Sequence, residues 1–149
     1  MIKNILNLGD AALYCDFGTE INKETNTQVI RYFKGIQKEN IEGINNLTPS
    51  YNKLIISFDL RKKNFKDLKK LIENLEIDES EKLKNKKVKI PVCNDESFSL
   101  DIKRLEEKLK IKRDVIYEKF FNKEFFCYMT GFIAGMPFLG DLDKSMRAK

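Results

Sequence analysis

Alternating apolar positions in the first sixty residues predict two pairs of strands. Within residues 11–17, apolar residues occupy every second position from Leu13 to Phe17, which is typical of a strand. Gly9-Asp10 precedes this segment and predicts a turn that links it to a short first strand. Residues 43–47 and 53–59 form a second pair of extended segments, the latter with strict alternation. Pro49 lies between them and favours a turn. We therefore expect two β-hairpins.

A helical pattern follows each predicted hairpin. The first helix begins after Asn22, which is a favourable N-cap, and ends near Asn40, while the second begins after Asn64. The apolar residues with helical spacing are Val29, Phe33 and Ile36 in the first helix and Phe65, Leu68, Leu71, Ile72 and Leu75 in the second. The order strand, strand, helix, strand, strand, helix predicts an α+β sandwich over residues 1–87, with both helices on one face of the sheet.

The rest of the chain, residues 88–149, predicts a second and less complete lobe. A charged linker over residues 76–87 leads to a half-buried strand, in which Val88, Ile90 and Val92 alternate and Pro91 lies outside the inward register. We expect Ser99 to cap a helix that buries Ile102, Leu105 and Leu109, followed by a short helix over residues 114–121 and an extended segment over residues 124–132. No closing element follows, so this lobe looks unfinished.

Composition places the chain among globular proteins and weakens a nucleic-acid role. Charged residues make up 34% and hydrophobic residues 42% of the 149 residues. The net charge is +5, but lysine accounts for 23 of the 28 basic residues, whereas nucleic-acid-binding surfaces usually add arginines and exposed aromatic residues to the lysines. The one dense basic stretch, Lys82–Lys89, follows an acidic run and is interpreted as a solvated linker, with a basic binding patch as the alternative. No segment is long and apolar enough for a membrane span or signal peptide, so we expect a cytoplasmic protein.

The chain contains no histidine, which excludes histidine-based triads, general bases and metal ligands. The three cysteines, Cys15, Cys93 and Cys127, show neither disulfide-framework nor zinc-site spacing, and we expect all three to be small buried residues. Asp141 and Asp143 would share a face on a strand and hold Mg²⁺ through water, but on a loop they are solubilising acids. We favour the loop interpretation and predict no metal site.

Residues 127–143, with the sequence CYMTGFIAGMPFLGDLD, are apolar and rich in glycine. Glycine is unfavourable inside a helix, so this segment suggests that backbone approaches a ligand or a companion polypeptide closely. In one interpretation, the glycine backbone contacts a phosphate or carboxylate in a pocket whose walls are Phe132 and Phe138. The other gives them tight turns where strands and a second polypeptide pack. We favour this second interpretation, because no known phosphate-loop pattern is present.

The chain resembles the B-subunit family of prokaryotic 5-oxoprolinase, also called allophanate hydrolase subunit 1, which includes the kinase A inhibitor of sporulating bacteria. The resemblance rests on GDAALYCDFGTEI, TPSYNKLIISFD, KIPVCND and YMTGFIAGMPFLGDLD. The family pattern G-F-x-P-G-F-x-Y-L-G-G-L is kept at Gly131, Phe132, Gly135, Leu139, Gly140 and Leu142. The chain departs from it at Ala134 and Met136, and Phe120 stands where many members carry histidine. Members also continue for some seventy or more residues, so the chain resembles a C-terminally truncated member.

This resemblance implies a ferredoxin-like-type α/β sandwich over residues 1–87 and the first part of a cyclophilin-like β-barrel over residues 88–149. It also implies one component of a hydrolase that opens 5-oxoproline to glutamate with ATP and Mg²⁺. That component is inactive alone and works in a heteromeric complex with homologues of the C and A subunits. We predict substrate or nucleotide binding at Tyr128, Gly131, Phe132, Gly135, Phe138 and Gly140, with catalytic residues unassigned.

Three assignments have an alternative at this point. The chain also resembles a kinase inhibitor, in which case residues 1–87 would dock on a sensor histidine kinase. Tyr51 would either contact a ligand or pack on its hairpin neighbours, and we favour packing. Asp10 is interpreted as a turn residue rather than a catalytic one.

Overall fold

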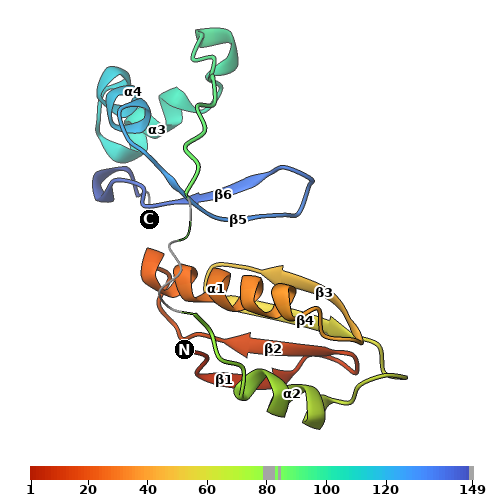
Figure 1. The fold of residues 1–149 in the computed structure, drawn as a ribbon. Helices are drawn as coiled ribbons and strands as arrows, with labels where there is room; N and C mark the ends of the chain where they lie inside the picture. Colours follow the sequence, from red (N-terminus) through yellow and green to blue (C-terminus); the bar gives the residue numbers. More distant parts are fainter. Residues whose placement is uncertain (79–82, 84, 148–149) are drawn as a thin grey trace. The chain divides into compact units, whose positions relative to one another are not determined.

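The computed structural model describes residues 1–78, 83 and 85–147 (Figure 1). It contains two compact units, each of which includes two separate parts of the chain. The first unit spans Met1–Lys84 and Tyr128–Phe138, and the second spans Asn85–Cys127 and Leu139–Lys149. Part of the predicted linker and of the basic stretch, residues 79–82 and 84, lies outside the described residues.

The first unit contains a four-stranded antiparallel sheet. Its strands are β1 (Asn4–Asn7), β2 (Ala12–Asp16), β3 (Ile44–Pro49) and β4 (Lys53–Phe58), in the order β1-β2-β4-β3. Leu13 pairs with Ile56, and Cys15 pairs with Leu54, so the alternating residues of the two central strands meet on one face. Both predicted hairpins are confirmed, and Gly9 has the positive φ of +61° that its turn requires.

Two helices begin where the sequence predicts their caps. Helix α1 (Lys23–Glu39) follows Asn22, whose Oδ1 accepts a 2.8 Å hydrogen bond from the backbone N–H of Thr25. It ends at Asn40, which adopts a left-handed conformation. Helix α2 (Phe65–Glu73) follows Asn64, which caps it in the same way.

One hydrophobic core joins the sheet to both helices. Helix α1 packs against β3 and β4, and α2 packs against β2 (Figure 1). The fully buried members are Leu13, Cys15, Val29, Ile36, Leu54, Ile56, Phe58, Leu68 and Ile72. Burying one such large aliphatic side chain contributes about 1.5–3 kcal/mol, so this core is the main source of stability for the sandwich. The prediction that both helices lie on one face of the sheet is confirmed.

The second unit is mainly helical and has a small core. It contains the short 3₁₀ helix η1 (Glu96–Phe98), α3 (Ile102–Leu109), α4 (Arg113–Phe121) and the 3₁₀ helix η2 (Lys144–Met146). Ile102 and Ile116 are its buried apolar residues within the described part of the chain, and α3 packs against α4. Strands β5 (Phe126–Thr130) and β6 (Pro137–Gly140) form a separate two-stranded sheet that contributes residues to both units.

Two predictions for this region are wrong. Residues 88–92 form no strand, and Val88, Ile90 and Val92 are exposed, because the described chain supplies no neighbouring strand for them to pair with. Ser99 is not the N-cap of α3, since Asp101 precedes the helix and makes no side-chain capping bond. The Ser99 hydroxyl instead contacts the Tyr117 hydroxyl at 2.8 Å.

The remaining element predictions agree with the structure at the level of mixed helix and sheet. Helices α3 and α4 and strand β5 lie where periodicity predicts them. Among the described residues, no helix is both long enough and apolar enough to cross a membrane.

Candidate functional site

The glycine-rich motif forms the β5–β6 hairpin and its turn. The backbone N–H of Gly131 donates to the Met136 carbonyl at 3.1 Å, and the Met136 N–H donates to the Ile133 carbonyl at 3.0 Å. Phe132 and Gly135 both have positive φ, +66° and +81°. The turn is therefore held in one hydrogen-bonded conformation, which uses the conformational freedom of Gly135.

Asn26 on α1 connects this hairpin to the sandwich. Its side chain is 2% exposed, and Nδ2 lies 3.1 Å from the Ser50 carbonyl, 2.9 Å from the Tyr51 carbonyl and 3.0 Å from the Tyr128 carbonyl. The first two acceptors belong to the β3–β4 turn, and the third belongs to β5. One buried amide thus joins three chain segments within the first unit.

An aromatic cluster lies beside this amide. The Tyr51 ring stacks on the Tyr128 ring at a centroid distance of 5.7 Å and meets the Phe138 ring edge-on at 6.3 Å. The Ser50 hydroxyl lies 3.3 Å from the Met129 sulfur. Aromatic pairs in these geometries stabilise contacts by about 0.5–1.5 kcal/mol beyond area burial. The hairpin is therefore anchored near its base by apolar as well as polar contacts.

The structure brings together two of the six predicted binding residues. Tyr128 and Phe138 share the aromatic cluster, and Tyr128 is only 3% exposed. Phe132 is 91% exposed and lines neither of the two depressions described below. Binding of substrate or nucleotide by these six residues stays a prediction.

The three motif glycines occupy different surroundings. A Cβ added to Gly135 would find no atom within 4 Å, whereas one added to Gly131 would lie 3.2 Å from the Met129 methyl group. Gly140 is half-buried at the end of β6. Within the described chain, the glycine backbone at the turn tip is open rather than pressed against a neighbour.

Two surface depressions among the described residues are lined by residues other than the predicted site. One, of about 430 Å³, lies between the C-terminal ends of α1 and α2 and is lined by Glu39, Ile41, Leu71, Asn74, Leu75 and Glu76. The other, of about 270 Å³, is lined by Met1, Lys3, Phe17, Glu24, Thr25 and Gln28. Both have charged residues on their walls.

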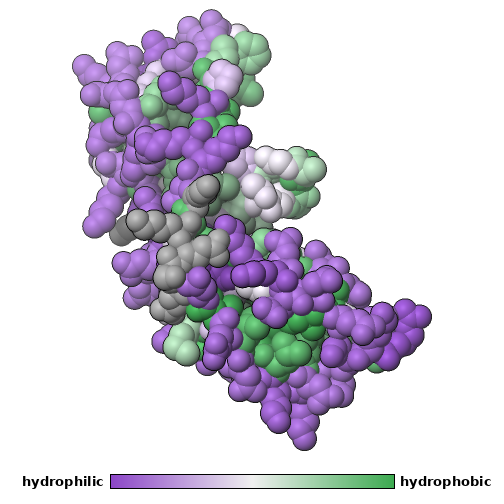
Figure 2. Space-filling view, in the orientation of Figure 1, coloured by the Kyte–Doolittle hydropathy of each residue, from purple (hydrophilic) through white to green (hydrophobic). Residues whose placement is uncertain are grey.

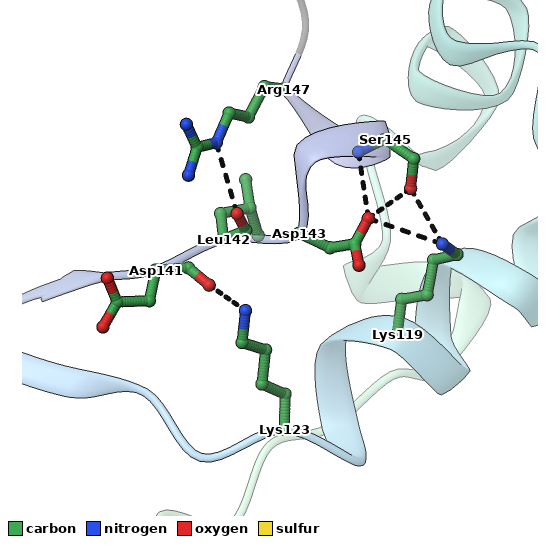
Figure 3. Close-up of polar contacts among 7 residues, drawn as sticks. All are labelled: Lys119, Lys123, Asp141, Leu142, Asp143, Ser145 and Arg147. Atoms are coloured by element: carbon green, nitrogen blue, oxygen red, sulfur yellow. Dashed lines mark hydrogen bonds and ion pairs between the residues drawn. The ribbon is translucent and has the colours of Figure 1, made fainter.

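The two acidic residues of the motif lie in the loop around η2 (Figure 3). Asp143 caps η2, accepting a 2.9 Å hydrogen bond from the Ser145 N–H, and Lys119 lies 3.4 Å from the same carboxylate. The Ser145 hydrogen bonds, with a smaller contribution from Lys119, lower the pKa of Asp143 to about 2. The Asp141 carbonyl accepts from Lys123. No group of three or more metal-ligating side chains occurs among the described residues. Both acids lie outside the strands, at the positions where the loop interpretation expects them.

The prediction that all three cysteines are buried is correct only for Cys15. Cys93 and Cys127 are exposed, because the first lies in the unpaired segment after residue 88 and the second lies on β5. Burial raises the pKa of the Cys15 thiol to about 12. None of the three has a histidine neighbour, since the chain contains none.

Sequence reasoning missed Asn26. A signal was available, because Asn26 precedes Val29 by three residues and Phe33 by seven, which puts an amide on the apolar face of the helix. A polar residue at a core position usually has specific hydrogen-bond partners. The pattern could not predict that one of its partners is the Tyr128 carbonyl, 102 residues further along the chain.

Comparisons with known proteins agree with the family resemblance that the motif indicates. The family model for the carboxyltransferase domain, subdomain C and D, matches residues 3–149. The B subunit of 5-oxoprolinase from Bacillus subtilis (strain 168) is 28% identical over 156 residues, covering 97% of this chain and 65% of that protein. The chain thus spans somewhat less than two thirds of that relative's length.

Solved structures share the fold at low identity. A crystal structure of TTHA0988 has a TM-score of 0.75 and 22% identity, covering 91% of this chain and 26% of that chain. The Kluyveromyces lactis urea carboxylase has a TM-score of 0.64 and 18% identity, covering 85% of this chain and 13% of that chain. Because the family model and the Bacillus subtilis relative both align with nearly the whole sequence, this chain belongs to the carboxyltransferase domain, subdomain C and D, family.

Proposed function

We propose that the chain acts as a homologue of the B subunit of an ATP-dependent 5-oxoprolinase, which opens 5-oxoproline to glutamate. The observation that carries this proposal is the 28% identity to the B subunit of a 5-oxoprolinase over 97% of the chain. The kinase-inhibitor alternative has no comparable support, since none of the relatives described above carries that name. The enzymatic role is therefore favoured over inhibition of a kinase.

The described residues support a role that depends on partners. Histidine is absent from the sequence, and the described residues contain no group of three or more metal-ligating side chains. Lys119, which donates to the Ser145 hydroxyl, is held beside the Asp143 carboxylate. The chemistry of amide opening needs an electrophile to be activated and an anionic oxygen to be stabilised. These described groups do not form such a constellation, so we propose that homologues of the C and A subunits supply the rest of the site.

ATP with Mg²⁺ does not fit the described residues of this chain taken alone. The β5–β6 turn carries no cation, and the open Gly135 backbone has no facing side chain to complete a phosphate cradle. The walls of the first depression carry the carboxylates of Glu39 and Glu76, which repel phosphate, and those of the second combine the Glu24 carboxylate with Lys3. We propose that nucleotide is held by the assembled complex.

Within the assembly, we propose that this chain supplies an apolar wall. The half-buried rings of Tyr51 and Phe138 pack on the buried Tyr128 ring, which Asn26 anchors, and they present an apolar face that excludes water from whatever lies against it. A water-poor wall strengthens electrostatic interactions in the adjoining part of a site. This is the contribution to catalysis that the geometry supports best.

The proposal extends to the finer fold description and the location. The sheet order β1-β2-β4-β3 with two helices on one face is compatible with a ferredoxin-like sandwich whose edge strand comes from the N-terminus. We propose that residues 88–149 begin a cyclophilin-like barrel and that the complex works in the cytoplasm.

The direct test is reconstitution. The chain is co-expressed with the homologues of the C and A subunits from the same genome, and phosphate release is measured with ATP, with and without 5-oxoproline. We expect release that depends on 5-oxoproline from the complex and none from the chain alone. A properly assembled complex without such release would end the proposal.

A further inference from the structure

The Met129 side chain connects β5 to the β3–β4 turn through its sulfur atom. The Ser50 hydroxyl donates to this sulfur at an Oγ–Sδ distance of 3.3 Å, and the two residues are 79 positions apart in the sequence. Both residues are half-buried and belong to the first unit. A thioether sulfur is a weak hydrogen-bond acceptor, so this contact depends on the sulfur keeping its lone pairs.

The Met129 side chain is confined on a second side by Gly131. A Cβ added to this glycine would lie 3.2 Å from the Met129 methyl group, so the lack of a side chain at position 131 makes room for the methyl. The backbone on either side of Met129 is also fixed. The Tyr128 carbonyl accepts from the buried Asn26 amide, and the Gly131 N–H donates within the turn. A displaced Met129 sulfur therefore has to move β5 or the β3–β4 turn.

A small oxidant can reach this part of the hairpin. Figure 2 shows white and green atoms of the β5–β6 turn, located from Figure 1, at the surface of the molecule. Met129 itself is half-buried and is not one of the core residues. Oxidation to methionine sulfoxide converts a flexible apolar side chain into a polar one, and it occurs at the sulfur. The reactive atom is thus the same atom that accepts the hydrogen bond from Ser50.

We propose that Met129 is a modification site, at which oxidation of the sulfur by a peroxide loosens β5 from the β3–β4 turn. In this step one oxygen atom of hydrogen peroxide bonds to a lone pair of the sulfur, the O–O bond breaks and water leaves. The sulfur loses two electrons, which the peroxide gains. Methionine sulfoxide reductases remove the oxygen, so the change is reversible. The proposal concerns a contact within this chain and does not rest on the proposed function.

Oxidation at either lone pair of the sulfur weakens the contact. An oxygen added on the side of Ser50 needs about 2.7 Å to the hydroxyl oxygen. The sulfur must then move beyond its present 3.3 Å from Oγ. An oxygen added on the other side leaves the sulfur with less electron density for the hydroxyl and places a polar atom in the confined space around the side chain. The bond from Asn26 to the Tyr128 carbonyl remains in both cases, so the hairpin loosens without unfolding.

The test treats the purified full chain with dilute hydrogen peroxide and identifies the oxidised methionines by mass spectrometry. Backbone hydrogen exchange in β5 is then compared between the reduced and the oxidised chain, with β2 as the internal reference. We expect Met129 sulfoxide to form and exchange in β5 to become about threefold faster, as the loss of one weak hydrogen bond predicts. Exchange in β2 should not change, and treatment with methionine sulfoxide reductases should restore the slow exchange in β5.

Two leucine variants assign the effect to one sulfur. Met129→Leu conserves side-chain volume and cannot be oxidised at this position, so peroxide should leave its β5 exchange unchanged. Met136→Leu is the matched control, because Met136 lies in the same hairpin turn with 42% exposure, and peroxide should still accelerate β5 exchange in this variant. Ser50→Ala removes the donor, so its β5 exchange should be fast before any oxidation. The proposal is overturned if Met129 stays reduced after Met136 is oxidised, if oxidised and reduced chains exchange equally, or if the acceleration persists in Met129→Leu.

Discussion

Replacing Asn26 with alanine should loosen the hairpin from the sandwich. The side chain is 2% exposed, and its Nδ2 faces the carbonyls of Ser50, Tyr51 and Tyr128. An amide nitrogen carries only two hydrogens, so the three acceptors share them. Alanine removes both donors and leaves all three carbonyls without this partner.

The size of the effect follows from which carbonyls water can reach. The Ser50 and Tyr51 bonds are part-buried, so each should cost about 1 kcal/mol of unfolding free energy, the net value of a typical hydrogen bond. The Tyr128 bond is buried, and an unsatisfied buried carbonyl costs about 1–3 kcal/mol. Because two hydrogens serve three acceptors, we expect a total loss of about 2–4 kcal/mol. This is a large share of the roughly 5–15 kcal/mol typical of a folded domain.

Two measurements together check this expectation. Urea unfolding followed by circular dichroism gives the change in unfolding free energy, and hydrogen exchange gives the local effect on residues 126–138. Asn26→Ala should lower the first and speed exchange in the hairpin more than in β2 or β4. Asn26→Asp should be at least as destabilising, because its carboxylate accepts but cannot donate to the same carbonyls.

The control is Thr27→Ala, a change to the next residue of α1. Thr27 is less buried, and its hydroxyl bonds the Lys23 carbonyl of its own helix, so we expect a change within about 0.5 kcal/mol. If Asn26→Ala costs less than about 1 kcal/mol and leaves hairpin exchange as slow as in the wild type, the anchoring role of Asn26 is refuted.

Three further outcomes test other parts of the structure. Cys15 should resist Ellman's reagent at pH 8 in the native state, because burial raises its pKa to about 12, while the other two cysteines react; three fast thiols would contradict this burial. Asp16 pairs with Lys53, and this hydrogen bond lowers the Asp16 pKa, so Asp16→Asn should cost up to about 1 kcal/mol at pH 7. The difference should disappear as the pH falls through the lowered pKa of Asp16 in the folded state, and a pH-independent difference in urea unfolding would refute the ion-pair account. Gly135→Ala should cost about 1 kcal/mol of unfolding free energy, because its φ of +81° is unfavourable for alanine. Gly131→Ala should cost less, because the added methyl group only meets the end of the flexible Met129 side chain. Equal thermal midpoints of the two variants would show that the turn is not held in this conformation.

Local patterns are sufficient where the decisive contacts are close in sequence. The two β-hairpins and the caps at Asn22 and Asn64 were predicted correctly, since a capping side chain bonds a backbone group three residues away. Alternation also identifies the buried face of β4, because successive side chains of a strand point to opposite sides. The same reasoning fails at Ser99, where the hydroxyl contacts Tyr117 on another helix instead of capping α3.

The sequence by itself determined the sandwich elements, the family motif and the absence of histidine chemistry. Only the tertiary structure decided that residues 88–92 remain unpaired, because strand formation requires a neighbour that no local pattern reveals. It also decided that Asn26 meets Tyr128 across 102 residues and that Phe132 points to solvent. Both features depend on how segments that are distant in the sequence are arranged in space, whereas periodicity shows only which face of a single element is apolar.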